Sequence, residues 1–425
     1  MLRTLASVAP LLFGVAILLT GQGLQGTLLP VRANLEGFST LSIGLMGGAY
    51  FFGFTLGCLR GSALVRRVGH IRVFAAMTAA ASAVPLLHGI WVETWLWWVL
   101  RFATGYCFAV LYVVIESWLN EQSSNETRGA VFSAYTLITL TVLAVGQQML
   151  LLYDPQQMYL FAIASAIVSM AAIPVVLSVA PTPHPVEQKV RLDLRRLFRV
   201  SPAGTLGCLA SGFANGPFWA LAPVFIAGYS DDVSLAAWFM TSAVLGGALG
   251  QWPLGLWSDR VDRRWVIGFA ALVGLAVGLA IGFMFQALPT LALMLMGGAW
   301  GAVAFPLYAV SVAHTNDHAN PGEYVMISSG LLLMYGIGAI LGPFTASLAM
   351  QFVGAGGLFL FSALIHLLLV SYIGLRLTRR EPAPDEEHVR FADALASTQT
   401  ASHVYEDEMA AEEQAEEAAA GVRPA

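Results

Sequence analysis

The sequence predicts an all-α integral membrane protein in which twelve transmembrane helices form two parallel six-helix halves. Three observations predict this fold. The chain is 57% hydrophobic and only 11% charged, apolar stretches of about 20 residues recur along it, and similar segments return at a fixed spacing. Each stretch is long enough to cross a hydrocarbon core of roughly 30 Å as a helix, whose backbone is hydrogen-bonded within the segment.

Polar breaks between the apolar stretches define the predicted spans. Membrane strands would be about 10 residues of alternating polarity, and the stretches do not alternate. The predicted N-terminal half, 1–180, contains six spans, at 8–30, 40–60, 73–92, 95–118, 130–152 and 157–180. The predicted C-terminal half, 202–380, contains six more, at 202–227, 235–257, 265–286, 290–313, 324–350 and 355–376.

The basic residues predict the orientation of these spans. All but two of the 21 Lys and Arg residues fall in segments on one side; the exceptions are Arg32 in an opposite loop and Arg101 inside a span. Because Lys and Arg accumulate in cytoplasmic loops, we expect a multi-pass protein of the cytoplasmic (inner) membrane with both termini in the cytoplasm.

Two polar segments lie outside the predicted spans. Residues 181–201 form a basic cytoplasmic linker, either a short amphipathic helix on the anionic inner leaflet or a solvated connection. Residues 381–425 carry twelve Asp or Glu against Arg390 and Arg423. Such an acidic segment has little apolar surface to bury, so we expect a disordered cytoplasmic tail.

An internal repeat relates the two predicted halves. A shift of 193 residues places GQGLQGTLLPV at 21–31 over ANGPFWALAPV at 214–224, and the same shift places Gly53 over Gly246. Six spans separate the copies, so both have the same membrane orientation, and a central cavity is expected between the halves.

Several short motifs resemble those of the major facilitator superfamily. GLWSDRVDRR at 255–264 resembles its loop signature, with Asp262 in place of a glycine, while RFATG at 101–105 and GAILGP at 338–343 resemble patterns of spans 4 and 5. VVIES at 113–117 and LGQWPLG at 249–255 are similar to its YcaD-like branch. Over residues 1–380 the resemblance implies a secondary transporter of a small solute that works by alternating access, with proton coupling left open.

The resemblance also implies a substrate cavity lined by spans 1, 4, 7 and 10. Arg101 stands out there, because a charge inside a span is costly and is a functional candidate by default; the alternative is a structural Arg bonded to carbonyls. Amide and aromatic side chains suit a neutral or amphipathic solute, with Arg101 able to accept an anionic group, although each residue could simply pack helices. The candidates are Gln22, Gln25, Arg101, Thr104, Tyr112, Asn215, Phe218, Trp219, Trp300, Tyr308 and Ser311.

Charged residues in the predicted cytoplasmic loops suggest a gate. The resemblance implies that Asp259 caps a helix of the opposite half, yet its repeat partner is Arg66, a reversed charge. We therefore expect Asp259 to meet span 5 near Arg128, and Arg66 or Arg67 to meet Glu323, unless these charges are independently solvated. The full set is Arg66, Arg67, Arg72, Glu116, Arg128, Asp259, Arg260, Arg263, Arg264 and Glu323.

Small residues predict close helix packing, and isolated histidines leave the question of coupling open. Glycines four apart let helices approach closely, and Gly338, Gly342 and Pro343 could bend span 11; the packing set is Gly53, Gly57, Gly246, Gly250, Gly338, Gly342 and Pro343. His314 or His366 could carry a proton, but a lone His is more often packed. Cysteine spacing predicts no metal site or disulfide.

The sequence distinguishes a transporter from three other classes of function, namely an enzyme, a channel and a transport-dead sensor, to different degrees. An enzyme would need a nucleophile, paired carboxylates or metal ligands, and we find none of these constellations, so we expect no enzyme and no cofactor. A channel would need a continuous charged or carbonyl-lined pore. A transport-dead sensor with the same fold remains the alternative. We expect a monomer whose partners are the bilayer and a small-molecule substrate, with H+ as a possible coupling ion and no nucleic acid.

Overall fold

The computed structural model describes residues 2–123, 125–177, 193–320, 323–378 and 391. The first half consists of α1 Leu2–Leu35, α2 Thr40–Val68, α3 His70–Ile90, α4 Thr94–Glu121, α5 Asn125–Gln148, η1 Met149–Leu152, α6 Tyr159–Met170 and α7 Ala172–Val176. After α8 Leu194–Val200, the second half consists of α9 Pro202–Ala227, α10 Ser234–Ser258, α11 Arg263–Met284, η2 Phe285–Ala287, α12 Thr290–Ala304, α13 Pro306–Asn316, α14 Tyr324–Val353 and α15 Gly357–Leu377.

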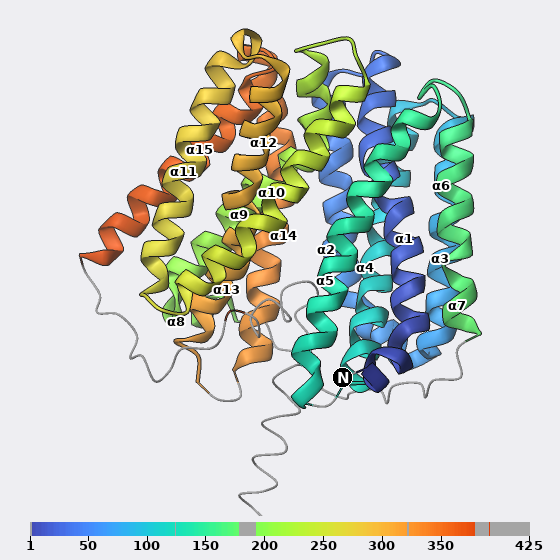
Figure 1. Ribbon diagram of the computed structural model, residues 1–425, viewed down its shortest axis with the longest axis horizontal. Helices are drawn as coiled ribbons and strands as arrows, with labels where there is room; N and C mark the ends of the chain where they lie inside the picture. Colours follow the sequence, from blue (N-terminus) through green and yellow to red (C-terminus); the bar gives the residue numbers. More distant parts are fainter. Residues whose placement is uncertain (1, 124, 178–192, 321–322, 379–390, 392–425) are drawn as a thin grey trace, which may run out of the picture.

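The helices confirm an all-α membrane protein. Among the described residues, eleven helical segments are long and apolar enough to cross a membrane. The helix α10 has the required length at 25 residues and is not among those eleven segments. Spans 5, 6, 9 and 10 each continue through a short second helix, and the described residues contain no strand. In Figure 1 the helices run side by side, with α1–α7 to the right and α9–α15 to the left.

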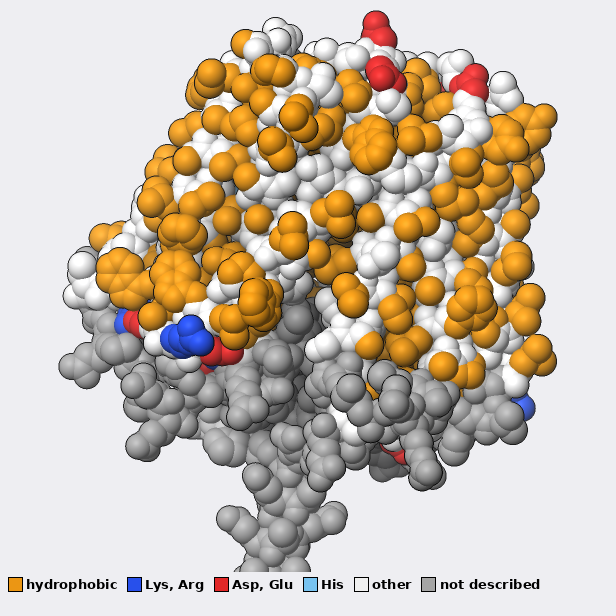
Figure 2. All heavy atoms as spheres, in the orientation of Figure 1, with side chains coloured by type: hydrophobic (Ala, Val, Ile, Leu, Met, Phe, Trp, Pro, Cys, Tyr) orange, Lys and Arg blue, Asp and Glu red, His pale blue; other side chains and the backbone are white. Residues whose placement is uncertain are grey.

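The two ends of the helical bundle differ in charge. In Figure 2, the blue side chains lie at the lower edge beside a few red ones, the upper edge shows red side chains, and hydrophobic side chains cover the face between them. We call the lower end, where α1 begins, the basic end; it carries Arg60, Arg66, Arg67, Arg72, Arg260 and Arg376. We call the upper end the acidic end; it carries Glu36, Glu93, Asp154, Asp231 and Asp232 beside Arg32.

The hydrophobic surface between these ends matches a lipid-facing belt. Large apolar side chains on it are more than half exposed, from helices of both halves: Phe13, Phe52, Leu137, Val145, Ile173, Trp252, Phe283, Leu291, Leu295 and Leu368. A water-soluble monomer rarely exposes a contiguous apolar patch of this extent, so the belt identifies the part of the protein that lies in the bilayer.

Equivalent glycines pack equivalent helix pairs in the two halves. A Cβ at Gly53 of α2 would overlap the carbonyl oxygen of Phe102 in α4, and a Cβ at Gly246 of α10 would overlap that of Gly298 in α12. Gly57 and Gly250 make the same approach one turn later. The repeat seen in the sequence is therefore a repeat of close helix contacts at these four glycines.

The buried core joins the halves at one end and separates at the other. At the acidic end, one cluster of buried residues combines side chains from α1, α2, α4 and α6 with side chains from α9–α12, α14 and α15. At the basic end, the first half has its own cluster, and two other clusters belong to α8–α15. The halves are thus packed together at the acidic end.

The contacts between the halves at the acidic end are made by small and polar residues. Gly44 of α2 lies against Pro343 and Ser347 of α14, and Gly47 lies against Ala220 of α9. Thr241 of α10 joins the halves by hydrogen bonds to the end of α5: it accepts from Gln148 Nε2 at 2.8 Å and donates to Gln147 Oε1 at 3.1 Å. Pro343 of α14 therefore serves the interface between the halves, whereas Gly342 packs against Pro217 of α9 within the second half.

The predicted linker and tail are described only in part. Within 181–201 the chain forms α8, whose Leu197 is buried against α14 and α9 residues while Leu194 and Phe198 are exposed. Residues 178–192, 379–390 and 392–425 lie outside the described residues. The domain boundaries at 180, 201 and 380 therefore stay predictions. Phe391 is described, and it is buried against the second half.

Candidate functional site

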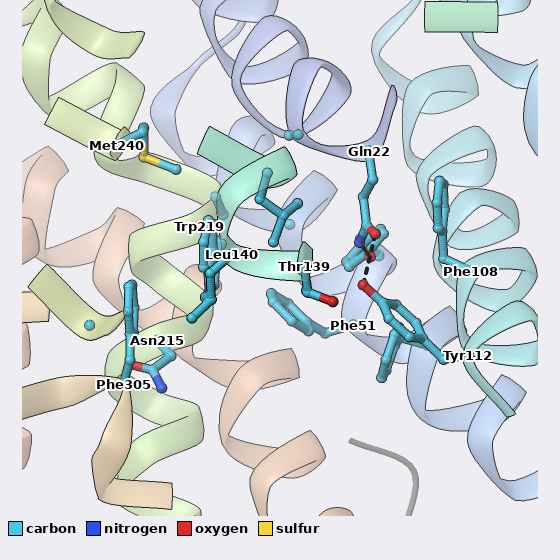
Figure 3. Close-up of a pocket in the computed structure, with 18 of the residues that line it drawn as sticks. Gln22, Phe51, Phe108, Tyr112, Thr139, Leu140, Asn215, Trp219, Met240 and Phe305 are labelled. Carbon is cyan, nitrogen blue, oxygen red and sulfur yellow. Dashed lines mark hydrogen bonds between the residues drawn. The ribbon is translucent and has the colours of Figure 1, made fainter. Parts of the chain in front are cut away.

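A cavity of about 370 Å³ lies between the halves, at the middle of the helices. Its volume is at the small end of the range of roughly 300–1,000 Å³ that is usual for small-molecule sites. The first half lines it with α1, α2, α4 and α5, and the second half with α9, α10, α14 and the junction of α12 and α13. Figure 3 shows side chains from both halves pointing into this space.

A polar cluster forms the side of the cavity that belongs to the first half. Gln22 of α1 donates from Nε2 to the Tyr50 hydroxyl at 2.9 Å and accepts at Oε1 from the Tyr112 hydroxyl at 3.0 Å. Three helices, α1, α2 and α4, are held together by this one amide. Arg101 of α4 lies above the Tyr50 ring, with its guanidinium carbon 4.3 Å from the ring centre, a cation–π arrangement.

Arg101 has no acidic partner among the described residues. No described carboxylate forms an ion pair with its guanidinium, and its buried Nε has no hydrogen-bond acceptor there. The lining residues comprise amides, hydroxyls, aromatic rings and aliphatic side chains, with Arg101 as the charged member. The cavity therefore carries an uncompensated positive charge in surroundings of low polarity, where its field is strong.

An aromatic wall forms the opposite side. Trp219 of α9 and Phe305 stack with their ring centres 5.4 Å apart and their planes 7° apart. Phe305 reaches this position because span 10 breaks there: α12 ends at Ala304, and Pro306, which has no backbone N–H, begins α13. Behind them Phe218 stacks on Trp300 at 4.8 Å and supports the wall.

Further polar groups in the lining are left without a protein partner. Both side-chain polar atoms of Gln25, the Thr139 hydroxyl and Oδ1 of Asn215 are buried and have no hydrogen-bond partner among the described residues. Buried polar groups are normally hydrogen-bonded to protein, water or a bound molecule. These atoms are therefore available to a solute in the cavity.

The structure brings together eight of the predicted cavity residues and places three elsewhere. The eight that line the cavity are Gln22, Gln25, Arg101, Thr104, Tyr112, Asn215, Trp219 and Tyr308. The prediction is wrong for Phe218 and Trp300, which lie behind the wall, where Trp300 donates to the Ser362 hydroxyl at 3.1 Å. It is also wrong for Ser311, which donates to the Leu307 carbonyl at 2.7 Å and packs against Gly207.

Sequence reasoning missed the lining contributed by spans 2, 5, 8 and 11. These spans add several aromatic and polar side chains: Tyr50, Phe51, Phe54, Thr136, Thr139, Gln147, Met240, Gln251 and Tyr335. Gln147 and Gln251 carried a usable signal, because an amide in the middle of an apolar span is unusual. The aromatic residues carried none, since the lipid-facing side of these helices is equally apolar.

The predicted charge pairing across the basic end is not formed among the side chains that the structure describes. Glu323 pairs with Arg196 of α8 at 2.9 Å, and Arg66, Arg67 and Arg72 are exposed. The expectation for Glu323 is therefore corrected here, because the core divides at this end and each half satisfies its own charges. Arg260 is exposed, Glu116 accepts from the Tyr135 hydroxyl at 3.3 Å, and the side chain of Arg128 lies outside the described residues.

The charged residues of the loop signature at 255–264 instead make their contacts within the second half. Arg263 bonds Asp259 at 3.3 Å and forms a buried ion pair with Asp317 at 2.8 Å, while Arg264 binds Asp262 at 2.6 Å. Asp259 also accepts from the backbone N–H of Phe391 at 2.8 Å. The predicted contact of Asp259 with span 5 is thus replaced by contacts to its own half and to a residue beyond the last span.

Two carboxyl groups at this end have depressed pKa values. Hydrogen bonds from Arg196 hold the pKa of Glu323 below its usual value. Burial raises the pKa of Asp262, but its hydrogen bonds with the side chain and backbone of Arg264, together with that charge, lower it more, so the net shift is downward. Both groups are therefore ionised at neutral pH.

The two histidines considered for coupling lie away from the cavity. His314 is buried against His318, with ring centres 4.8 Å apart. His366 is buried in α15, where its Nδ1 lies 2.7 Å from the Ser362 carbonyl oxygen. Neither lines the cavity. Within the described part of the chain, no group of three or more His, Cys, Asp or Glu is placed to hold a metal ion.

Known proteins of one family match this chain in sequence. The family model of the Major Facilitator Superfamily matches residues 11–230 and again 204–410. The uncharacterized MFS-type transporter Ent638_1421 of Enterobacter sp. (strain 638) is 28% identical over 386 residues, covering 88% of this chain and 96% of that protein. YcaD of Salmonella heidelberg, also an uncharacterized MFS-type transporter, is 27% identical over 384 residues, with the same coverage.

A solved structure matches the fold. The nucleoside transporter NupG superimposes with a TM-score of 0.74 over 88% of this chain and 99% of its own, at 13% sequence identity. An identity this low supports the helix arrangement alone. Together with the sequence matches, it confirms the predicted fold class and the resemblance to the YcaD-like branch.

Proposed function

We propose, from the premise that this chain belongs to the major facilitator superfamily, that it is a secondary active transporter which carries a small solute by alternating access. Its relatives are membrane transporters. One observation above all supports transport of a small solute by alternating access. The cavity is shared by the two halves, while the core that joins them is continuous at the acidic end and divided at the basic end.

The charge distribution predicts how the molecule is oriented in the membrane. The basic end carries most of the Arg side chains, and the positive-inside rule assigns such an end to the cytoplasm. In this orientation the protein lies in the cytoplasmic membrane with the acidic end outside, and the structure corresponds to the inward-facing state. The opposite state requires the contacts of Gly44, Gly47 and Thr241 to separate and the basic end to close.

Spin-label distances test the conformational cycle without a known substrate. One pair, Glu93→Cys with Asp231→Cys, spans the acidic end, and a second, Arg66→Cys with Arg260→Cys, spans the basic end; all four residues are exposed. Cys58, Cys107 and Cys208 are first replaced. Alternating access predicts two populations for each pair, with a longer acidic-end distance accompanying a shorter basic-end distance. A single unchanging distance for both pairs would contradict the proposal.

Flux tests transport itself and separates a carrier from a transport-dead sensor. Proteoliposomes are incubated with a bacterial metabolite extract, with and without a pH gradient, and the solutes that enter are identified by mass spectrometry. The control is Gln148→Cys with Thr241→Cys, joined by a short thiol cross-linker, which should lock the acidic end and stop entry. A second linked pair, Tyr229→Cys with Thr290→Cys, lies within one half and should leave entry intact. Entry unaffected by the first cross-link would contradict alternating access.

A further inference from the structure

The two sides of the cavity differ in chemistry, and they belong to different halves. The first half presents Arg101 over Tyr50, together with the Gln22 amide. The second half presents the stacked pair Trp219 and Phe305. In Figure 3 Gln22 and Tyr112 lie on one side of the space and Trp219, Asn215 and Phe305 on the other, with Thr139 and Leu140 between them.

Arg101 determines the charge of the ligand. Its guanidinium lines the cavity and has no carboxylate partner among the described residues, so a bound anion would remove an uncompensated charge from a medium where its solvation is poor. A cationic solute would meet repulsion with no acidic group in the lining to offset it. A neutral solute would leave the guanidinium unpaired.

The aromatic wall determines the shape of the ligand. Trp219 and Phe305 lie almost parallel, and Phe218 and Trp300 fix them from behind, so the wall is flat and rigid. Flat aromatic groups pack on such a surface by offset stacking or edge contacts, which contribute about 0.5–1.5 kcal/mol beyond area burial. A flexible aliphatic chain gains the area term alone.

From this juxtaposition we propose that the ligand is a small organic anion with a flat aromatic body, its anionic group at Arg101 and its ring against Trp219 and Phe305. The unpartnered polar atoms of Gln25, Thr139 and Asn215 accept or donate hydrogen bonds along its length. The inference rests on the proposed function in taking this cavity as the substrate site. Binding of such a ligand would also couple to movement of the two halves, because one molecule would contact both of them.

Binding of a matched ligand set tests the proposal. Isothermal titration calorimetry at pH 7 on the purified full chain compares 3-phenylpropionate and indole-3-acetate with their neutral amides, with phenethylamine, and with the aliphatic anion hexanoate. We expect the aryl carboxylates to bind at least about tenfold more tightly than the amides and about threefold to tenfold more tightly than hexanoate, and phenethylamine not to bind. Equal binding of acid and amide, or no aryl carboxylate binding at millimolar concentration, overturns the proposal.

Two variants should each remove one preference and keep the other. Arg101→Gln should abolish the preference for acid over amide and retain that for aromatic over aliphatic, while Trp219→Leu should do the reverse. Arg260→Gln on the exposed basic end and Trp252→Leu, which is 74% exposed on the lipid-facing belt, are matched controls that should change neither. Gel filtration and thermal melting check folding. An unchanged acid preference in folded Arg101→Gln contradicts the assignment.

The experiment distinguishes this proposal from the transport proposal. Calorimetry measures equilibrium binding, which needs no transport cycle. Selective binding without flux into proteoliposomes would support the ligand class and reject the carrier. Flux of other solutes, with no aryl carboxylate binding, would support the carrier and reject the ligand class.

Discussion

The acidic and basic ends of the molecule are stabilised by different kinds of contact. At the acidic end, glycines and the hydroxyl of Thr241 join one half to the other. At the basic end, Arg263, Asp317 and Asp259 form ion pairs within the second half. If the chain alternates between two states as proposed, this difference predicts that acidic-end contacts set the balance between the states, whereas basic-end contacts stabilise the second half in both.

The largest effect is expected from the buried ion pair at the basic end. Asp317→Ala leaves Arg263, a fully buried side chain, without this partner, which typically costs about 3–5 kcal/mol. Thermal unfolding in detergent should therefore occur at a much lower temperature. The two spin-label distances should keep the same proportions of states. Arg72→Ala, an exposed change at the basic end that leaves the label sites free, serves as the control; a shift in state populations without loss of stability would contradict the comparison.

A large effect on the state balance is expected at Gly44. Gly44→Leu places a side chain against Pro343 and Ser347 of the opposite half, and overpacking of this kind costs about 1–3 kcal/mol. The outward-facing population should rise by about 5-fold to 150-fold, seen as a longer Glu93–Asp231 label distance. Gly374→Leu, where a Cβ meets no atom within 4 Å, is the control. An unchanged distance would mean that α2 and α14 do not close the acidic end.

A smaller shift is expected at Thr241. Thr241→Val removes a hydroxyl that both accepts from Gln148 and donates to Gln147, and the net loss for a typical hydrogen bond is about 0.5–1.5 kcal/mol. Water can reach the separated amides in the other state, so the acidic-end label pair should shift toward the longer distance by less than in Gly44→Leu. Thr345→Val serves as the control, because that hydroxyl bonds within its own helix.

The smallest effect is expected at the partly exposed pair of Glu323 and Arg196. Because the pKa of Glu323 is lowered by Arg196, its stabilisation is complete above the pKa of the unfolded state, about 4.3, and is lost as the pH falls through the lower folded value. Glu323→Gln should lower the melting temperature slightly at pH 7, and the difference from the unchanged protein should shrink as the pH falls through the folded pKa of Glu323. A difference that grows on acidification would contradict the assigned pairing.

Much of the fold was predictable because membrane spans obey simple rules of length and polarity. The predicted spans coincide with helices, although span 1 was predicted to end at residue 30 and α1 continues to Leu35. There Arg32 bonds the Pro155 carbonyl at 3.0 Å and pairs with Glu36 at 2.7 Å. A charge at a helix end with local partners looks, in sequence, like the start of a loop.

Less of the site was predictable, because it depends on helix rotation and on the conformational state. A helix that is apolar all round gives no sequence signal for the face it turns to the cavity, so Tyr50 and Tyr335 were missed. Phe218 and Trp300 were assigned to the cavity by position in their spans, yet the break at Pro306 places Phe305 in front of them. The predicted charge pairs would cross the basic end, where the core of this structure is divided between the halves, and a sequence does not say whether the two halves meet there.

Phe391 affects how shortened or tagged forms of this protein should be designed. Its ring occupies the place where a side chain on Gly255 would extend, and its amide covers one oxygen of Asp259. A chain that ends after α15 would leave the depression at Gly255 uncovered. It would also leave one oxygen of Asp259, at the loop that joins α10 to α11, without this hydrogen-bond donor. Fusion partners are therefore better placed beyond residue 391, and a shortened chain should be compared with the full one before its behaviour is taken as representative.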